Sequence, residues 1–305
     1  MRGTALRPFR LALLASTALS FPAFAQDAIE LAPIDVQGSS YETEGTDSYA
    51  TQLISVGEKA AMSPREVPQS TTVITNRQIQ DGGYTALEEA LSDTAGLMIL
   101  NNDTGRSSIY SRGYEFDYLY FDGLPAPVSS IYGTQPDLSI VDHIEVLKGP
   151  AGLFIGTGEP AGSINMRLKQ ARAVAPEGAI TTSVDSNGHA RVEADASGAL
   201  NADGTLRGRL AAAYADGDGF IDKQENGVSS LYGTLAWDVT PDTLLTFSLS
   251  HMERDIAPFN GLPTYADNSL IWIDSDATTA ADWNDFNNAT TDAIFAVEHH
   301  LDNGG

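Results

Sequence analysis

The chain has 305 residues, with 41 acidic and 17 basic side chains and no cysteine. A net charge of -24 repels phosphate backbones, so the composition argues against nucleic acid as a partner. The lack of cysteine in the sequence removes disulfides, thiolate metal sites and cysteine nucleophiles. Scarce lysine with abundant Asp, Asn, Gly, Ser and Thr favours an exported β-protein over a helical cytosolic enzyme.

The N-terminus has the pattern of a secretory signal. Arg2, Arg7 and Arg10 are basic, residues 11–24 are apolar, and the stretch ends in Ala23-Phe24-Ala25. Small residues at 23 and 25 fit signal-peptidase cleavage, and the apolar stretch is shorter than the roughly 20 residues that span a bilayer. Residues 1–25 are therefore predicted to be a signal peptide. No later apolar run reaches the length of a membrane helix, so a membrane crossing would use strands.

Residues 26–60 are polar and lack lasting periodicity, which predicts an extended linker. One island stands out at residues 29–36, where apolar residues alternate with others around a proline. Such a strip can add as an extra strand to the sheet edge of a partner protein.

Residues 61–170 read as a compact α+β domain. Residues 71–75 form a short β-branched strand, and strands are also predicted at residues 118–121, 143–147 and 163–168. A helix is predicted with Thr85 as N-cap and Glu88 completing a capping box, with Leu87 and Leu91 on its buried face and Gly96 at its end. Asp122-Gly123 predicts a turn, and the Gly- and Pro-rich residues 149–162 predict a tightly folded loop.

Residues 171–305 change character and read as successive antiparallel strands. The strands are predicted at residues 179–184, 190–196, 206–214, 231–239, 244–252 and 293–299. Residues 201–205 and 240–243 are tight turns, whereas residues 216–230 and 256–292 are long connections, the asymmetry typical of an outer-membrane barrel. Alternation sets Leu245, Phe247 and Leu249 opposite Ser248 and Ser250. Six strands are fewer than the smallest barrels use, so the chain is expected to hold the first part of a larger one.

Three patterns suggest other sites and are rejected on context. Residues 156–161 resemble a dinucleotide-binding loop, but a strand follows where a helix is needed. Residues 216–225 resemble part of a calcium loop, but Tyr214 stands where the first carboxylate belongs. His299 and His300 are neighbours on a strand and point to opposite faces. No catalytic constellation is found, so we expect neither enzyme activity nor a resident metal or cofactor.

Several motifs in order carry a family resemblance. They are residues 65–73 (REVPQSTTV), Arg112-Gly113-Tyr114, Phe121-Asp122-Gly123, and residues 144–150 followed by 156–162. Together they resemble the plug domain of TonB-dependent siderophore receptors, with Ala161 where that family often has glycine. Residues 261–267 and 281–283 are similar to an extracellular loop of the hydroxamate and pyoverdine-like receptors. The resemblance extends from Ile29 through nearly all of the rest of the chain.

The resemblance implies an α+β plug domain (residues 61–170) followed by the first strands of a 22-stranded antiparallel transmembrane β-barrel (residues 171–305). It implies a ferric siderophore as ligand, the outer membrane and its lipid as location, and TonB, energised with ExbB and ExbD, as partner. The TonB box falls in residues 26–60, at Ile29, Glu30, Leu31, Ala32, Pro33, Ile34, Asp35 and Val36. The short N-terminal stretch implies an importer without a signalling domain.

A siderophore encloses its own iron, so its receptor needs aromatic faces, hydrogen-bond donors and a cation rather than metal ligands. Residues 101–108 and 125–135 are the expected plug apices. The candidate ligand-binding residues are Arg106, Tyr110, Tyr114 and Tyr132, with Tyr265 as a lid from an extracellular loop, although ordinary packing would also suit each of them. Arg112 is expected to be structural and to pair with a carboxylate of the plug or the barrel wall.

Alternative functions stay open. A receptor of the same family that imports haem, cobalamin or an oligosaccharide would share most of these motifs. A passive porin or adhesin barrel would need neither residues 29–36 nor a plug. A periplasmic binding protein would need a second buried layer behind the alternating strands.

Overall fold

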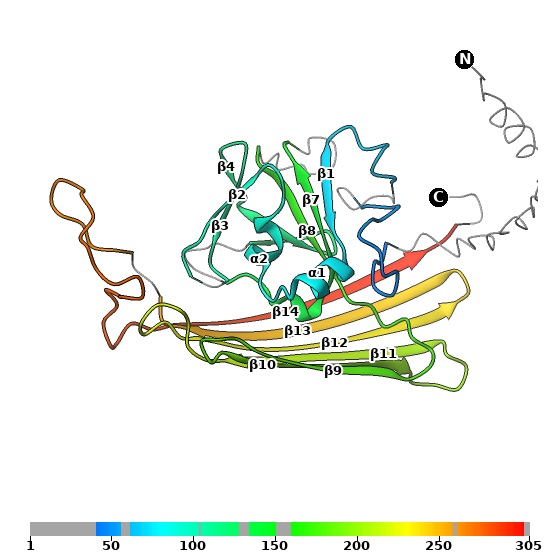
Figure 1. Cartoon of the computed structure of the whole chain (residues 1–305). Helices are drawn as coiled ribbons and strands as arrows, with labels where there is room; N and C mark the ends of the chain where they lie inside the picture. Colours follow the sequence, from blue (N-terminus) through cyan, green and yellow to red (C-terminus); the bar gives the residue numbers. More distant parts are fainter. Residues whose placement is uncertain are drawn as a thin grey trace, which may run out of the picture. The chain divides into compact units, whose positions relative to one another are not determined.

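The computed structural model describes residues 41–55, 62–103, 105–127, 134–150, 160–258 and 261–301. These residues form two regions, a globular α+β region up to residue 168 and a series of long strands after it (Figure 1). Among the described residues, no helix is long and apolar enough to cross a membrane. The predicted signal peptide and residues 29–36 lie outside the described residues.

The globular region is built on a five-stranded sheet in the order β1-β7-β8-β5-β6. Its strands are β1 (Ser70–Ile74), β5 (Tyr118–Phe121), β6 (Leu124–Pro127), β7 (Val141–Lys148) and β8 (Gly162–Leu168). All pairs are antiparallel except β5 with β8. The predicted strands at 118–121, 143–147 and 163–168 lie within β5, β7 and β8.

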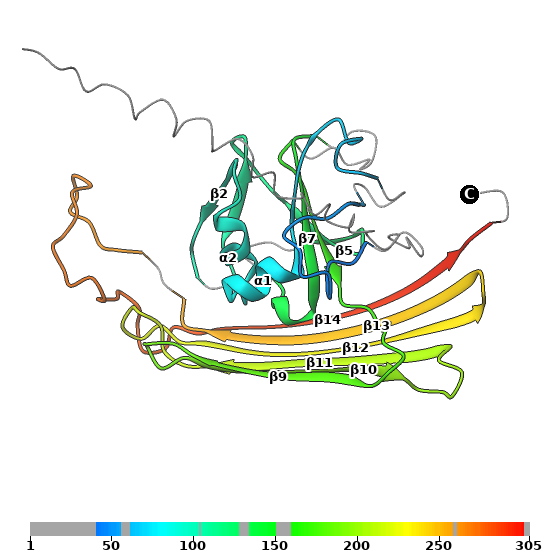
Figure 2. The same cartoon turned by 45° about the vertical axis from the view of Figure 1, so that its right-hand side comes forward.

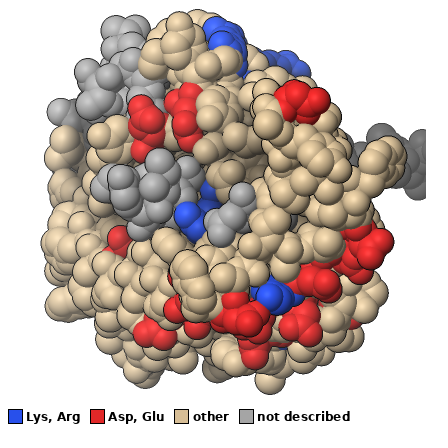
Figure 3. Space-filling view, turned by 90° about the vertical axis from the view of Figure 1, so that its left-hand side faces the viewer, with Lys and Arg blue, Asp and Glu red and all other residues tan. Residues whose placement is uncertain are grey.

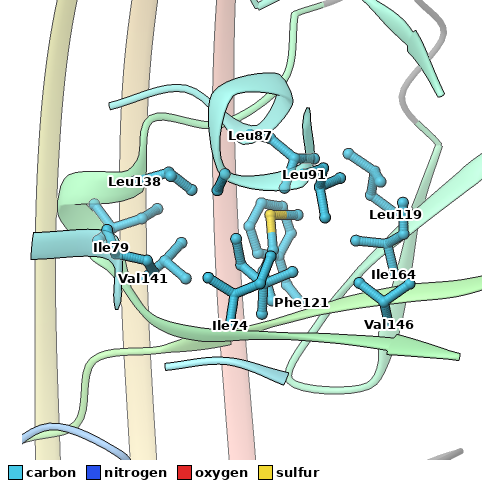
Figure 4. Packing of buried hydrophobic residues seen from close by; sticks show 14 of the residues in the cluster. Ile74, Ile79, Leu87, Leu91, Leu119, Phe121, Leu138, Val141, Val146 and Ile164 are labelled. Carbon is cyan, nitrogen blue, oxygen red and sulfur yellow. The ribbon is translucent and has the colours of Figure 1, made fainter. Parts of the chain in front are cut away.

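The core of this region lies between the sheet and two short helices. Leu87 and Leu91 of α2 (Leu87–Ser92) are fully buried, as are Ile144 of β7 and Ile164 of β8. Figure 4 shows Leu87, Leu91 and Ile164 converging on one apolar cluster with side chains of α1 (Asn76–Gly82) and β5. Burying a large aliphatic side chain contributes about 1.5–3 kcal/mol, so this cluster holds the helices on the sheet.

The helices differ from the predicted one. The structure has α1, which was not predicted, with a capping box formed by Thr75 and Gln78. Helix α2 begins one residue later than predicted, because the Glu89 carboxylate, rather than Glu88, accepts hydrogen bonds from the backbone N–H groups of Thr85 and Ala86. Glu88 is instead buried and serves the neighbouring loop, as described below. Helix α2 ends at Ser92, before the predicted stop at Gly96.

A second, three-stranded sheet in the order β2-β3-β4 carries one apical loop. Its strands are β2 (Leu97–Leu100), β3 (Ser108–Ser111) and β4 (Tyr114–Glu115). The loop between β2 and β3 contains residues 101–107, and Arg112-Gly113 makes the turn between β3 and β4. Asp122-Gly123 turns β5 into β6 with positive φ at both residues, 43° and 84°, as the sequence predicts.

The long strands form one antiparallel sheet in the order β14-β13-β12-β11-β10-β9. Its strands are β9 (Glu177–Val184), β10 (Ala190–Ala199), β11 (Leu206–Asp216), β12 (Asn226–Thr240), β13 (Thr243–Ile256) and β14 (Phe286–His299). Figure 2 shows the strands curving together along their length. Each predicted strand lies within an observed one, and the six form an open part of a barrel.

The two faces of this sheet differ as the alternation predicts. On β13 the side chains of Phe247 and Leu249 are exposed, whereas Ser248, Met252 and Arg254 are buried. The buried face contacts the globular region, since Tyr232 of β12 packs in its apolar core and donates from its hydroxyl to the carbonyl of Lys169 at 2.7 Å. The exposed face presents a band of apolar side chains suited to lipid.

Residues 41–55, which the sequence assigns to the linker, are packed against the globular region. Thr43, Ile54 and Ser55 are almost fully buried. Ile54 forms an isolated bridge with Met62 and packs with Val67, Tyr120 and Leu147. Residues that pack on the globular region are thus found before the predicted plug boundary at residue 61.

Candidate ligand-binding site

The two predicted apical loops are brought together by backbone hydrogen bonding. The N–H of Gln135 donates to the carbonyl of Gly105 at 2.6 Å, and the Gln135 side-chain amide donates to the carbonyl of Ser107 at 2.7 Å. Gln135 is itself buried. Because Gly105 belongs to one loop and Gln135 to the other, these hydrogen bonds join the two loops.

Arg106 occupies this junction with its charge already engaged. Its Nη1 lies 2.9 Å from Oδ2 of Asp103, and the guanidinium stands 4.1 Å from the ring centre of Phe286, the first residue of β14. The side chain is largely buried, with 15% of its surface exposed. The guanidinium, in contact with an aromatic ring and a carboxylate, therefore places a positive charge at the junction of the two loops.

Gly105 is held from three directions. Its N–H donates to Oε1 of Glu88 on α2 at 2.5 Å, and its carbonyl accepts from Gln135. The third contact is Arg254 of β13, whose guanidinium lies so close that a Cβ on Gly105 would meet Cζ and Nε at 2.8 Å. With φ at +76°, position 105 also has a backbone conformation that favours glycine. The backbone conformation therefore favours glycine here, and a Cβ at this position would have to displace the end of the Arg254 side chain.

Several buried polar groups around Gly105 have no hydrogen-bond partner among the described residues. They are Nε and Nη2 of Arg254, Oε2 of Glu88 and Oε1 of Gln135. Burial raises the pKa of the Glu88 carboxyl, and the hydrogen bond from Gly105 opposes that shift. Buried donors and acceptors without partners are unfavourable. These groups around Gly105 would therefore gain stability from a further hydrogen-bond partner.

A buried ion pair fixes the second loop to the six-stranded sheet β9–β14, here called the strand wall. Arg191 of β10 donates to both carboxylate oxygens of Asp137 at 2.7 and 2.8 Å, and also to Glu193 at 2.6 Å. Asp137 also caps the short helix η2 (Leu138–Ile140) by accepting from Ser139. The Arg191 guanidinium, with the hydrogen bonds from Ser139, holds the pKa of Asp137 below its ordinary value despite complete burial.

The predicted tyrosines are placed unevenly. Tyr110 on β3 is half-buried and its hydroxyl lies 3.3 Å from Glu115, while Tyr114 on β4 is exposed. Tyr265 is exposed in the loop between β13 and β14, where its backbone bonds with Ser269 and Asn268 close a turn. None of these tyrosines has a hydrogen bond to Arg106 in the described part of the chain. Tyr132 lies outside the described residues, so its place in the site stays a prediction.

The carboxylate partner expected for Arg112 is not found among the described residues. Arg112 has φ of 53° in the turn after β3, and its Nη1 lies against Gly149, where a Cβ would come within 2.7 Å. The charge of Arg112 contributes to lowering the pKa of Lys148, although burial of that lysine is the larger cause. The left-handed turn directs the side chain to the end of β7 rather than to an acidic residue.

A cavity of about 420 Å³ lies between the strand wall and the globular α+β region, which is the predicted plug. On the plug side it is lined by Leu124, Pro125 and Thr134, and on the wall side by Met252 and Thr290. Thr134 also approaches Asn288 of β14, at 3.4 Å between Oγ1 and Oδ1. The cavity is within the size range of small-molecule sites, and it adjoins the second apical loop.

Figure 3 shows the end of the molecule that carries the long connections between strands, with acidic side chains gathered over part of the face and basic atoms in a hollow. A cleft of about 270 Å³ among the long connections is lined by five acidic side chains, those of Asp216, Glu225, Asp255, Asp282 and Asp285. Among the described residues, no group of three or more acidic, histidine or cysteine side chains is arranged to hold a metal ion.

Sequence reasoning missed Gly105, Glu88, Asp137, Arg254 and Phe286. Arg254 had a usable signal, because it is in phase with Ser248 and Met252 on the inward face of a strand whose outward face is apolar. A charged residue in that phase points to the interior of a barrel. The others depend on contacts between segments far apart in the sequence.

A family model described as TonB-dependent Receptor Plug Domain matches residues 63–163. Among curated proteins, the ferripyoverdine receptor of Pseudomonas aeruginosa is 30% identical over 86% of this chain and 33% of its own length. The ferric-pyoverdine M114 receptor PbuA of Pseudomonas sp. strain M114 is 32% identical over 84% of this chain and 32% of its own length. The chain thus spans about a third of the curated relatives it matches.

Solved structures agree with these relatives. The crystal structure of the ferripyoverdine receptor of the P. aeruginosa outer membrane, bound to ferripyoverdine, matches with a TM-score of 0.82 and 30% identity over 88% of this chain and 36% of that one. The alcaligin outer-membrane receptor FauA of Bordetella pertussis matches with a TM-score of 0.63 and 34% identity over 71% of this chain and 39% of that one.

Proposed function

The chain belongs to the TonB-dependent siderophore receptor family of the Gram-negative outer membrane, and on that premise we propose that the protein imports a ferric siderophore with energy supplied through TonB. The observation that carries the proposal is the pair of apical loops joined at Gly105 and Gln135, with Arg106 between Asp103 and Phe286. This is a cation and an aromatic ring at the plug apex, where an anionic chelate would dock.

The ligand class that we propose is a pyoverdine-like or other hydroxamate-containing chelate. The relatives named as ferripyoverdine and ferrioxamine B receptors support this choice over haem, cobalamin or an oligosaccharide. A chain with net charge -24 needs a local cation to attract an anionic chelate, and Arg106 lies on the loop that would face it. The iron would arrive inside the siderophore, as cargo.

Energy coupling is proposed at residues 29–36. An extended strip can pair with a sheet edge of TonB through backbone hydrogen bonds, which would let TonB pull on the segment that leads to the plug. Residues 41–55 connect this strip to β1 and are packed on the plug, so a pull on the strip would be transmitted to them.

The test is uptake of radioactive iron by cells that lack their own siderophore receptors and express the full-length protein. Ferripyoverdine and ferrioxamine B are supplied separately, with haem and cobalamin as comparison ligands. We expect accumulation with at least one of the two siderophores and its loss in a strain without TonB. Uptake of haem or cobalamin alone would assign the receptor to another ligand class.

The coupling strip is tested in the same cells with Ile34→Pro, which removes a backbone donor from the proposed added strand. We expect uptake to be abolished and surface binding of the siderophore to be retained. Gln37→Pro, just beyond the strip, is the matched control and should transport. Unimpaired uptake by the Ile34→Pro protein would mean that another segment engages TonB.

A further inference from the structure

The N-terminal end of the packed segment, residues 41–55, is held by one buried carboxylate of β7. Asp142 accepts the backbone N–H of Thr43 at 2.9 Å on Oδ2 and that of Glu44 at 2.7 Å on Oδ1. Both Asp142 and Thr43 are almost completely buried. Two backbone donors on one carboxylate are charge-assisted hydrogen bonds, which are stronger than neutral ones.

A second carboxylate of the same strand holds the other end. Glu145 accepts the backbone N–H of Ser55 at 2.8 Å and its hydroxyl at 2.7 Å. Glu145 also accepts from the side-chain amide of Asn165 on β8 at 2.8 Å. The two ends of the segment are therefore fastened to two acidic residues that lie three positions apart on β7.

His143 lies between these two carboxylates. Its Nδ1 is 2.5 Å from Oδ2 of Asp142, and its Nε2 is 3.5 Å from Oε1 of Glu145. The imidazole is 1% exposed. A protonated imidazole thus provides a shared positive charge for two buried carboxylates that would otherwise repel each other.

Other charges surround the three residues. Arg167 of β8 is the cross-strand partner of His143, lies 3.7 Å from Glu145 and 3.6 Å from Asp122, and stands over the Tyr41 ring at 5.0 Å.

From the segment and the wall, Arg209 of β11 donates to both oxygens of Glu44 at 2.6 and 2.7 Å, and Arg172 pairs with Glu42. These charges surround the Asp142–Glu145 cluster, but none of their ion pairs includes the imidazole itself.

We propose that Asp142, His143 and Glu145 form a latch that fastens residues 41–55 to the plug, and that the latch opens when His143 loses its proton. With a neutral imidazole, the two carboxylates lose the charge between them, and their hold on the segment weakens. Arg167 alone remains near Glu145, and no other cation among the described residues replaces the imidazole beside Asp142.

The pH range follows from the surroundings of His143. Burial lowers its pKa, but the hydrogen bond to Asp142 and the charges of Asp142 and Glu145 outweigh burial and raise the pKa from 6.5 to about 9. A raised histidine pKa gives stabilisation that is complete below the ordinary value of 6.5 and is lost as the pH rises through 9. The latch is therefore closed in mildly acidic solution and opens on the alkaline side.

The position of the latch gives it a place in transport, and this part of the inference rests on the proposed function. Residues 41–55 lie in the chain between residues 29–36 and β1, so a pull from TonB would load these bonds before the sheet. The latch itself depends on neither ligand nor TonB, so its failure can be told apart from failure of the proposed function.

The test uses a spin label in the full-length receptor, purified without ligand. The label is attached at Gln52→Cys, an exposed position in the segment, because the 305 residues contain no cysteine; any cysteine elsewhere in the receptor is first replaced. A second label at Ala95→Cys, exposed between α2 and β2, reports on the plug fold. Spectra are recorded from about pH 6 to about pH 10, a range that brackets the histidine titration.

With native His143, the mobile fraction of the label at position 52 should rise about ten-fold or more across this range. The His143 pKa is raised from 6.5 to about 9, and each unit of that shift changes the equilibrium between attached and released segment by a factor of ten. His143→Arg keeps its charge throughout and should keep the label immobile. His143→Gln should be mobile at every pH, and position 95 should not change in any variant. Equal responses from the native and His143→Arg proteins, or an immobile label at pH 10 in the native protein, would overturn the latch; neither comparison needs the glutamine variant to fold.

Discussion

The guanidinium of Arg254 lies against the α-carbon of Gly105, and this contact joins strand β13 to the apical loop that carries Arg106. A methyl group on Gly105 would meet two atoms of the guanidinium at 2.8 Å. The carboxylate of Glu88, on helix α2, accepts a hydrogen bond from the backbone N–H of Gly105. The position of Arg106 is thus set jointly by the plug interior and by the wall.

Replacing Gly105 with alanine should displace the loop. The left-handed φ alone costs about 1–2 kcal/mol for a residue with a Cβ, and overpacking against Arg254 adds about 1–3 kcal/mol. We expect a lower melting temperature of the full-length receptor and weaker binding of the siderophore it transports. Gly83→Ala is the control, because Gly83 has φ of +62° and open space around its Cβ position. Equal melting temperatures for the two variants would show that Arg254 yields without resistance.

Asp137→Asn should loosen the plug from the wall. The substitution leaves Arg191 buried with only Glu193 as a charged partner, and breaking a buried ion pair costs about 3–5 kcal/mol. We expect the plug to be released at a lower urea concentration than in the native protein. Release is monitored by limited proteolysis. Asp282→Asn, which breaks the exposed pair with Lys223, should leave the urea midpoint unchanged. A shared midpoint would assign plug retention to apolar packing instead.

Arg106→Ala should weaken siderophore binding by about 1.5–3 kcal/mol, the range for a hydrogen bond to a charged group. The measurement is a titration of the purified full-length receptor with the iron-loaded siderophore that cells take up. Arg77→Ala removes an arginine from an exposed ion pair with Asp81 and should bind like the native protein. If both variants bind with native affinity, the chelate is held by other residues.

Glu145→Gln should remove an acid-sensitive component of stability. The charges of His143 and Arg167, with the hydrogen bonds from Ser55, outweigh burial and lower the Glu145 pKa to about 2. This stabilisation is present above the ordinary pKa of 4.5, is lost as the pH falls through 2, and amounts to about 3 kcal/mol at 1.36 kcal/mol per unit.

The check on Glu145 is acid unfolding of the full-length receptor, monitored by the spin label at position 52. The native protein should lose attachment of residues 41–55 between about pH 4 and pH 2. The glutamine variant should show a smaller transition there, because only Asp142, whose pKa is also lowered, still holds the segment through a carboxylate. Glu44→Gln is the control, because Glu44 meets Arg209 at the edge of the cluster and lacks contact with His143. A native transition in the glutamine variant would exclude Glu145 as its source.

The sequence predicted the strand wall well because its faces meet different surroundings. Phe247 and Leu249 alternate with Ser248 and Ser250, so residue type alone gives the period of two. The ends were less accurate: β12 begins at Asn226 rather than 231, since Asn226-Gly227-Val228-Ser229-Ser230 lacks the alternation. Val228 is the one large apolar residue in this stretch, and the outward-facing positions hold Gly227 and Ser229, so no apolar alternation marks the start of the strand.

Other features were hidden for physical reasons. Helix α1 contains one apolar residue, Ile79, so periodicity could not identify it, although the Thr75–Gln78 capping box was legible. The approach of Gly105 to Arg254 joins positions about 150 residues apart, and the sequence pattern holds no record of that distance. Arg106 was predicted as an apical-loop cation that binds the ligand, and that role stays a prediction. Its contacts with Asp103 and Phe286 could be seen only in the fold.

The pair formed by Asp137 and Arg191 also limits how these two positions can diverge. A single substitution at either one leaves a desolvated charge without its main partner, so a lineage that changed only one would pass through a poorly assembled protein. Divergence at this point therefore requires paired replacement, such as reversal of the two charges or their joint exchange for apolar residues. At these two positions, the sequences of the plug and of the strand wall are therefore constrained together, and neither can change alone without loss of stability.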